Sequence, residues 1–262
     1  MTPDQSTHLQ PEPMCISEIC TLIKNTLTAS KTTGYVLGIS GGIDSAVAAT
    51  LLVRAIGADR VTGLFLPSPT TPKADYADVN TLCAWLGIAL HTHPLDSILC
   101  AYQEICNENR HTWGNLTSRI RMNILYMYAN EHQQLVCGTS NKTEWYTGYF
   151  TKYGDAAADI QPIIHLFKDE IYALARDLGV PPVFIEKAPS AGLYEGQTDE
   201  ADLHMTYAQL NAALRSLEAS NWTPYTDDEK KALELYKASA HKRLPVPHCC
   251  TSNCLLCHPL LD

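Results

Sequence analysis

The stretch Gly34-Tyr35-Val36-Leu37-Gly38-Ile39-Ser40-Gly41-Gly42-Ile43-Asp44-Ser45-Ala46 decides how this chain folds. Its apolar part, residues 35–39, has β-branched and aromatic members and predicts a buried parallel strand. Ser-Gly-Gly then ends the strand where an apolar helical pattern begins, at residues 44–56. Adjacent glycines leave no Cβ to block a ligand, and they let successive N–H groups point into one concavity beside the positive end of the helix dipole. This joint therefore predicts an anion site, most simply for a phosphate.

Asp44 distinguishes this loop from the Walker A motif, in which a lysine follows the glycines at the spacing GxxxxGK[ST]. A carboxylate beside phosphates is repulsive unless a divalent cation bridges the two, so Asp44 indicates Mg²⁺. The alternative is an ordinary tight turn in which Asp44 only caps the helix. The loop alone leaves both interpretations open.

The length and composition are typical of one large α/β domain. We expect a single domain over residues 1–262, with a loose N-terminal arm at residues 1–14 and a cysteine-rich tail at residues 245–262. The net charge of −9 argues against a nucleic-acid partner and against an anionic membrane surface. No apolar run has membrane-spanning length, and six cysteines lie in apolar stretches as free thiols would, so we expect a cytoplasmic protein.

Strand and helix patterns alternate along most of the chain. They predict strands at residues 35–39, 61–66, 88–91 and 134–137, a polar segment at 107–115, and helices at 16–30, 44–56, 74–86, 116–131, 167–178, 207–217 and 227–240. This alternation predicts an α/β fold with a doubly wound parallel sheet and helices on both faces. Ser40 and Thr139 both follow strands, and we expect their loops to meet over one ligand at the carboxyl edge of the sheet. Two aperiodic segments, residues 146–160 and 188–200, predict a functional loop and a mobile lid.

Six short motifs occur in order along residues 15–245. They are SGGIDS (40–45), GTSNKTE (138–144), GYFTKYGD (148–155), ADIQP (158–162), GQTDE (196–200) and HKR (241–243). The first motif alone also fits GMP synthetases, argininosuccinate synthetases and tRNA-modifying enzymes. Together the motifs resemble the NAD synthetases, which are ATP pyrophosphatases of the adenine-nucleotide α-hydrolase-like superfamily with a Rossmann-like sheet.

The resemblance implies a ligase that catalyses the last step of NAD biosynthesis. ATP adenylates the carboxylate of nicotinic acid adenine dinucleotide (deamido-NAD) with loss of pyrophosphate, and ammonia then displaces AMP to give NAD. Glutamine-dependent relatives carry an extra N-terminal glutaminase domain, for which this chain has no room, so we expect free ammonia or ammonia from a separate protein. The family forms homodimers with the dinucleotide site near the interface, and we expect a homodimer here.

The resemblance also implies site residues, position by position. For ATP they are Gly38, Ile39, Ser40, Gly41, Gly42, Ile43, Asp44, Ser45, Thr139, Lys168 and Ser190. For deamido-NAD they are Arg119, Lys152, Asp159, His241 and Lys242, and for Mg²⁺ they are Asp44 and Glu144. Catalysis is assigned to Asp44, Lys152, Lys168 and Asp159. Without the motifs, Glu144, Arg119 and the lysines would be interpreted as solvated surface charges.

The tail departs from the family pattern. Cys249, Cys250, Cys254 and Cys257 lie with two histidines in residues 247–258, and the last two cysteines have a common Zn²⁺-ligand spacing. The second ligand pair of a zinc ribbon is missing. A tail that packs on the domain is therefore the alternative to a metal site.

Two other functions share parts of this motif pattern. The SGGIDS loop and the tail also fit a tRNA-thiolating ATP pyrophosphatase, against which the acidic charge and the GYFTKYGD motif argue. A nucleotide-sensing module would bind ATP without turnover, and the intact Asp44, Glu144, Lys152 and Lys168 argue against it. The leading hypothesis is an ammonia-dependent NAD synthetase.

Overall fold

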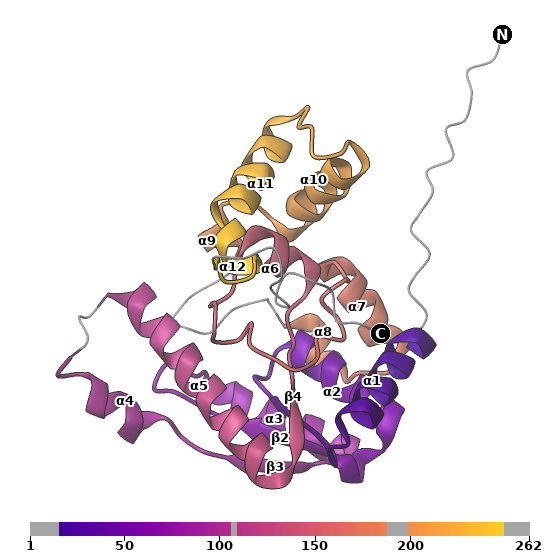
Figure 1. The fold of residues 1–262 in the computed structure, drawn as a ribbon, viewed down its shortest axis with the longest axis vertical. Coiled ribbons are helices and arrows are strands. Elements are labelled where there is room, and N and C mark those ends of the chain that lie inside the picture. The colour runs from indigo at the N-terminus through magenta and orange to yellow at the C-terminus, as the bar shows by residue number, and fades with distance from the viewer. Residues whose placement is uncertain (1–15, 106–108, 188–198, 249–262) are drawn as a thin grey trace.

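Four parallel strands form one sheet in the lower half of Figure 1, which shows a computed structural model that describes residues 16–105, 109–187 and 199–248. The strands are β1 (Gly34–Gly38), β2 (Val61–Phe65), β3 (Ala89–Thr92) and β4 (Gln134–Cys137). Their order is β3-β2-β1-β4, with Tyr35 of β1 paired to Val61 on one side and to Leu135 on the other. The chain runs outward from β1 to β3 and then returns to the far side of β1. Strand order thus reverses between β1 and β4, where open parallel sheets bind ligands.

Helices cover both faces of this sheet, as the alternating pattern predicts. One face carries α1 (Ile16–Ser30), α2 (Ile43–Ile56), the short 3₁₀ turn η1 (Ala58–Arg60), α3 (Lys73–Leu86), α7 (Lys168–Asp177) and α8 (Pro182–Glu186). The other face carries α4 (Asp96–Tyr102) and α5 (Arg110–His132). α2 is apolar around most of its circumference because it lies between the sheet on one side and α1 and α7 on the other. Its Leu51 and Leu52 are fully buried.

A group of helices lies beyond the carboxyl edge of the sheet, at the top of Figure 1. It consists of α6 (Lys142–Thr147), α9 (Asp199–Leu203), α10 (Tyr207–Ala219), α11 (Asp227–Ala238) and α12 (Ala240–Arg243). α10 and α11 pack on each other and on α6, around Leu214, Leu217 and Ala232. Because α6 follows β4 after a short loop, this group lies over the end of the sheet where the loops after β1 and β4 emerge.

Several elements differ from the expected ones. α5 begins inside the polar segment 107–115, because the Asn109 side chain accepts hydrogen bonds from the N–H groups of His111 and Thr112 at 2.9 and 3.3 Å. The aperiodic segment expected at residues 146–160 begins inside α6. The short helices α4 and α8 have no counterpart among the predicted helices. α8 begins at Pro182, whose fixed φ suits a first helical position.

Some expectations concern residues that the structure does not describe. The N-terminal arm, residues 188–198 of the expected lid, and the tail cysteines lie outside the described residues. The single-domain organisation stays a prediction. In the described ranges, no helix has the length and apolar character needed to cross a membrane.

Candidate active site

The loop between β1 and α2 has a backbone that could hold an anion. Gly41 has a φ of +81°, a conformation that residues with a side chain rarely adopt. The Gly42 N–H group donates to Ser40 Oγ at 3.2 Å, and Ser45 Oγ donates to the Gly42 carbonyl at 2.9 Å. The first helical bond of α2 joins the Ala46 N–H group to that same carbonyl. Helix geometry leaves the N–H groups of the first helical residues, Ile43, Asp44 and Ser45, without a partner inside the helix, so they can bind a ligand.

Asp44 lies in the first turn of α2, and its side chain contacts residues far along the chain. Its Oδ2 is 2.5 Å from Nζ of Lys168, the first residue of α7, and its Oδ1 accepts a hydrogen bond from Nδ2 of Asn141 at 3.0 Å. The N-cap residue of α2 is Gly42, and no side chain caps the helix. The alternative in which Asp44 merely caps α2 is therefore wrong.

The loops after β1 and β4 meet, as the sheet order requires. Thr139 follows β4, and two residues later Asn141 reaches Asp44 in the loop region after β1. The two partners are 97 positions apart in the sequence. The other expected ATP contact, Ser190, lies outside the described residues.

Lys168 is buried between two carboxylates. Only 4% of its side chain is exposed, and its Nζ lies 2.5 Å from Asp44 Oδ2 and 3.6 Å from Glu144 Oε1. Burial alone would lower the pKa of Lys168, but the charges of Asp44 and Glu144 raise it above its ordinary value. The ammonium is therefore charged. Lys168, a predicted ATP contact, thus lies beside both predicted Mg²⁺ ligands, Asp44 and Glu144.

Glu144 is positioned by a capping box at the start of α6. The Glu144 N–H group donates to the Asn141 side chain at 3.0 Å, and the Asn141 N–H group donates to the Glu144 carboxylate at 3.2 Å. Burial and the neighbouring Asp44 charge raise the pKa of the Glu144 carboxyl to about 8. Asp199, which accepts a hydrogen bond from the Tyr207 hydroxyl at 2.8 Å, adds to this effect. At neutral pH the cluster therefore holds one proton on Glu144.

The donor set of Asp44 and Glu144 fits a hard divalent cation. Both offer carboxylate oxygens, and the position between them already accommodates the positive charge of Lys168. Over the part of the chain that the structure describes, no group of three or more His, Cys, Asp or Glu could hold a metal. Two carboxylates are the usual protein share of a Mg²⁺ site that phosphates and water complete. The pair thus suits Mg²⁺ that binds with a nucleotide.

A second group of expected residues surrounds the loop at residues 148–155. Lys152 Nζ donates to the His241 carbonyl at 2.6 Å, and Arg119 Nη2 donates to the Lys152 carbonyl at 3.3 Å. The Lys242 ammonium donates to two backbone carbonyls of the loop at 2.7 and 2.8 Å, and burial lowers its pKa. The structure therefore brings Arg119, Lys152 and His241 together, while Lys242 anchors the loop beside them.

Asp159 lies apart from the cluster of Asp44, Lys168 and Glu144 (the Asp44 cluster), along the edge of β4. Its N–H group donates to the Val136 carbonyl at 2.9 Å, and its carboxylate accepts from the Val136 N–H group at 2.7 Å. The Tyr126 hydroxyl donates to the same carboxylate at 3.4 Å. Asp159 lines a hollow of about 460 Å³ with residues from the end of α5 and the start of β4. Of the described residues that line this hollow, none belongs to the Asp44 cluster.

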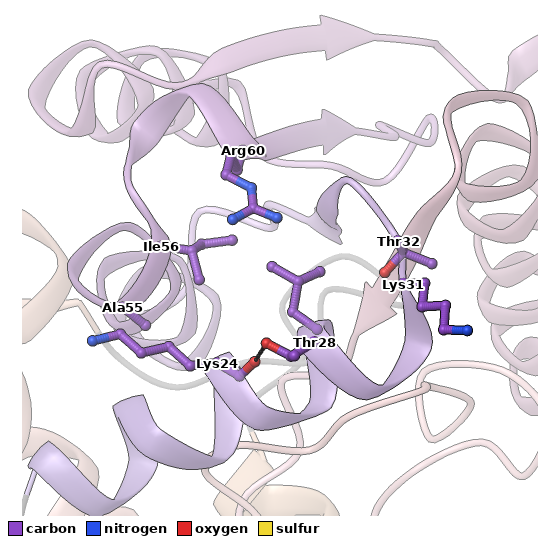
Figure 2. A pocket seen from close by; sticks show the side chains of 8 residues that line it. Lys24, Thr28, Lys31, Thr32, Ala55, Ile56 and Arg60 are labelled. Carbon is purple, nitrogen blue, oxygen red and sulfur yellow. Dashed lines mark hydrogen bonds between the residues drawn. The ribbon is translucent and has the colours of Figure 1, made fainter.

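Another hollow, of about 580 Å³, lies between the ends of α1 and α2 (Figure 2). Its lining includes Lys24, Lys31 and Arg60. Figure 2 shows the amines of Lys24 and Lys31 pointing to opposite sides, and Arg60 Nε donates to the Thr33 carbonyl at 2.8 Å. These cations do not converge on one ligand position. The hollow also lies at the amino edge of the sheet, because Thr33 and Arg60 directly precede β1 and β2.

Sequence reasoning missed Asn141 and Thr143. The Asn141-x-x-Glu144 spacing is a capping-box signal, and it could have indicated that Asn141 positions Glu144. Thr143 Oγ1 accepts from the Lys168 N–H group at 3.0 Å and donates to Asn211 Oδ1 at 2.7 Å. No local signal marks Thr143, because its side-chain partner is 68 positions away.

Comparison with known proteins agrees with this geometry. The model of the NAD synthase family matches residues 15–245. The NH3-dependent NAD+ synthetase of Methanoregula boonei is 47% identical over 221 residues, which cover 84% of this chain and 89% of that protein. The structure of the NH3-dependent NAD synthetase from Campylobacter jejuni matches with a TM-score of 0.78 at 33% identity, covering 90% of this chain and 97% of that one. The structure of NMN synthetase from Francisella tularensis matches with a TM-score of 0.79 at 35% identity, covering 90% of this chain and 98% of that one. The chain therefore belongs to the NAD synthase family, among its ammonia-dependent NAD synthetases.

Proposed function

We propose that this chain joins ammonia to deamido-NAD where the phosphate-binding loop meets the Asp44–Lys168–Glu144 cluster. As a family member it uses ATP, deamido-NAD and ammonia, and it forms NAD, AMP and pyrophosphate. The observation that carries the proposed site is the buried Lys168 ammonium, which lies 2.5 Å from Asp44 at the point where strand order reverses. There a fixed cation and the N–H groups of the loop can act on one phosphate chain.

In the first step, an oxygen of the nicotinate carboxylate attacks the α-phosphorus of ATP. The bond from that phosphorus to the bridging oxygen breaks, and pyrophosphate leaves with the electron pair. Negative charge grows on the leaving oxygens, so N–H groups and an ammonium fixed in advance stabilise the transition state more than the ground state. We assign this role to the N–H groups of the loop, residues 40–45, and to Lys168.

Mg²⁺ is the proposed companion of ATP, with Asp44 and Glu144 as its ligands. When bound, it supplies further positive charge to the phosphate oxygens. The raised pKa of about 8 keeps the Glu144 carboxyl protonated at neutral pH. Glu144 would have to release that proton in order to act as a ligand.

In the second step, ammonia attacks the acyl carbon and AMP leaves. Ammonium predominates over ammonia at neutral pH, so a base must remove a proton before the attack. We propose Asp159 or a bound water for this role, and hydrogen bonds from Val136 and Tyr126 hold the Asp159 carboxylate in one orientation along β4.

Deamido-NAD is proposed to contact Arg119, Lys152, His241 and Lys242 as well as Asp159. These residues form separate groups around the carboxyl edge and along β4. We also propose a homodimer, in which the partner chain would bring its own residues to a site that one chain leaves divided. Sedimentation velocity with and without deamido-NAD tests it, and a monomer that turns over at full rate would contradict it.

The cytoplasm is the proposed location. Cys20, Cys83, Cys100 and Cys137, which the structure describes, are free thiols, as in proteins of a reducing compartment. The net charge of −9 supports the proposed absence of a nucleic-acid partner.

The test is a mass-resolved incubation with deamido-NAD, ATP, Mg²⁺ and an ammonium salt. The proposal requires NAD and AMP to appear in equal amounts. A parallel incubation offers nicotinic acid mononucleotide instead, because one similar structure is that of an NMN synthetase. Formation of AMP without NAD would indicate that the acceptor is a different molecule, such as a tRNA.

Asp44→Asn should abolish NAD formation in a protein that still folds, although the loss of the Asp44–Lys168 ion pair should lower its Tm. Asp96→Asn is the matched control, since Asp96 also lies in the first turn of a helix but on the opposite face of the sheet. If the two variants form NAD at the same rate, Asp44 has no role in the reaction.

A further inference from the structure

A lysine outside the expected site holds the phosphate-binding loop. Lys187 is the C-cap residue of α8, and 30% of its side chain is exposed. Its Nζ donates to the Gly41 carbonyl at 3.0 Å, to Asp75 Oδ1 at 2.5 Å and to Asp78 Oδ2 at 2.7 Å. An ammonium has three N–H donors, and all three have partners here. The side chain thus joins α8, α3 and the loop at one point.

Asp75 and Asp78 present a suitable surface for this lysine. They are three positions apart on α3 and therefore lie on one face of the helix, with only 8% and 9% of each residue exposed. Two such carboxylates repel each other, and they repel nearby phosphates, unless a cation lies between them. Burial alone would lower the pKa of Lys187, but its hydrogen bonds to the two aspartates raise it. Lys187 therefore remains charged and neutralises part of this cluster beside the loop.

Lys187 also sets the direction of the peptide group between Gly41 and Gly42. In a trans peptide the C=O and N–H groups point in opposite directions, and the described chain has no cis peptide bonds. Because the Gly41 carbonyl faces Lys187, the Gly42 N–H group is turned into the loop, toward Ser40 Oγ. A peptide between two glycines can rotate with little steric hindrance. Such a rotation would direct a carbonyl oxygen at the phosphates.

We propose that Lys187 is a positioning residue of the ATP site: it bonds the Gly41 carbonyl on the side of Asp75 and Asp78, keeps that oxygen away from the phosphates, and so preserves the loop conformation that binds pyrophosphate. This inference rests on the proposed function, in which the loop binds the phosphates of ATP. Lys187 acts through the loop and does not touch the reacting atoms.

Lys187→Met removes the ammonium and keeps most of the side-chain length. We expect KM for ATP to rise about tenfold and kcat to fall, because a charged hydrogen bond to the loop is lost. KM for deamido-NAD should stay unchanged. Arg215→Met is the matched control: Arg215 is 32% exposed and also contacts two carboxylates, Asp169 at 2.8 Å and Glu170 at 3.1 Å. The control should lose thermal stability but keep KM for ATP.

A triple variant separates loop positioning from the burial of unpaired charge. Lys187→Met combined with Asp75→Leu and Asp78→Leu also removes the carboxylates that the single variant leaves without a cation. Leu has the branched shape of Asp but no polar atom. We expect Tm to recover toward that of the wild type while KM for ATP stays raised, since the Gly41 carbonyl still lacks its anchor. Recovery of KM together with Tm would overturn the inference.

Inorganic pyrophosphate gives a readout that does not require turnover. Its dissociation constant with Mg²⁺, measured by calorimetry, should rise about tenfold in both Lys187 variants. Unchanged pyrophosphate binding and unchanged KM for ATP in Lys187→Met would overturn the inference and leave the proposed function standing. If the wild type itself forms no NAD, the proposed function fails, and pyrophosphate binding still decides whether Lys187 positions the loop.

Discussion

Replacing Lys168 with methionine tests the centre of the proposed site. The Lys168 side chain is 4% exposed, and its Nζ lies 2.5 Å from Asp44 and 3.6 Å from Glu144. At 2.5 Å and an effective dielectric constant of about 20, the Coulomb attraction between Lys168 and Asp44 is about 7 kcal/mol, and Glu144 adds to it only when it is ionised. The desolvation of buried charges offsets most of this attraction, and removal of one partner from a buried ion pair costs about 3–5 kcal/mol.

The lower end of that range applies to Lys168→Met without metal. Glu144 is protonated at neutral pH, because its pKa is raised to about 8, so the variant leaves mainly Asp44 unpaired. Asn141 still donates a hydrogen bond to Asp44. We expect a loss of about 3 kcal/mol, which lowers Tm by about 6–12 °C in a chain of this size. Excess Mg²⁺ should restore much of that loss, because the cation can take the position that the ammonium has left.

The assay is thermal unfolding with and without MgCl₂ at constant ionic strength. Lys142→Met is the control, because Lys142 pairs with Glu218 at 2.7 Å but is 20% exposed, so solvent screens that pair more than the Lys168–Asp44 pair. Mg²⁺ should stabilise Lys168→Met more than the wild type and should have no special effect on Lys142→Met. The reasoning is refuted if Lys168→Met loses less than about 1 kcal/mol, or if Mg²⁺ shifts Tm equally in all three proteins.

Three further predictions concern Glu144, Gly148 and Lys152. Between pH 4.5 and about pH 8, Glu144 is protonated in the folded protein but ionised in the unfolded chain. The free energy of unfolding should therefore fall as pH rises through this window. Urea unfolding at several pH values should show this fall in the wild type and not in Glu144→Gln. Gly148→Ala should lower the free energy of unfolding by about 2–4 kcal/mol, because φ is +72° and the new Cβ would lie 2.0 Å from Ser239 Cβ. Gly179 has the same φ but open space around it, so Gly179→Ala should lower it by only about 1 kcal/mol. Thermal unfolding measures both. Lys152→Met should raise KM for deamido-NAD in steady-state assays and leave KM for ATP unchanged, whereas an equal rise in both would remove Lys152 from the dinucleotide site.

Elements with a strong local pattern were predictable almost to the residue. β4 occupies the expected residues 134–137, and α1 ends at Ser30, because alternation and helical spacing are properties of neighbouring residues. The start of α5 was not predictable from apolar spacing. It depends on a side-chain cap from Asn109, which extends the helix into a polar segment.

The sequence by itself determined the glycine turn between β1 and α2, the α/β alternation and the family, since each rests on residue types at short, fixed spacings. It also indicated Asp44, Glu144 and Lys168 as separate members of motifs. Only the tertiary structure decided their arrangement. Lys168 reaches Asp44 across 124 positions, and Lys187 reaches Gly41 across 146. It also placed Asp159 along β4, away from the Asp44 cluster. Contacts between such distant residues follow from strand order and helix packing, which no local pattern specifies.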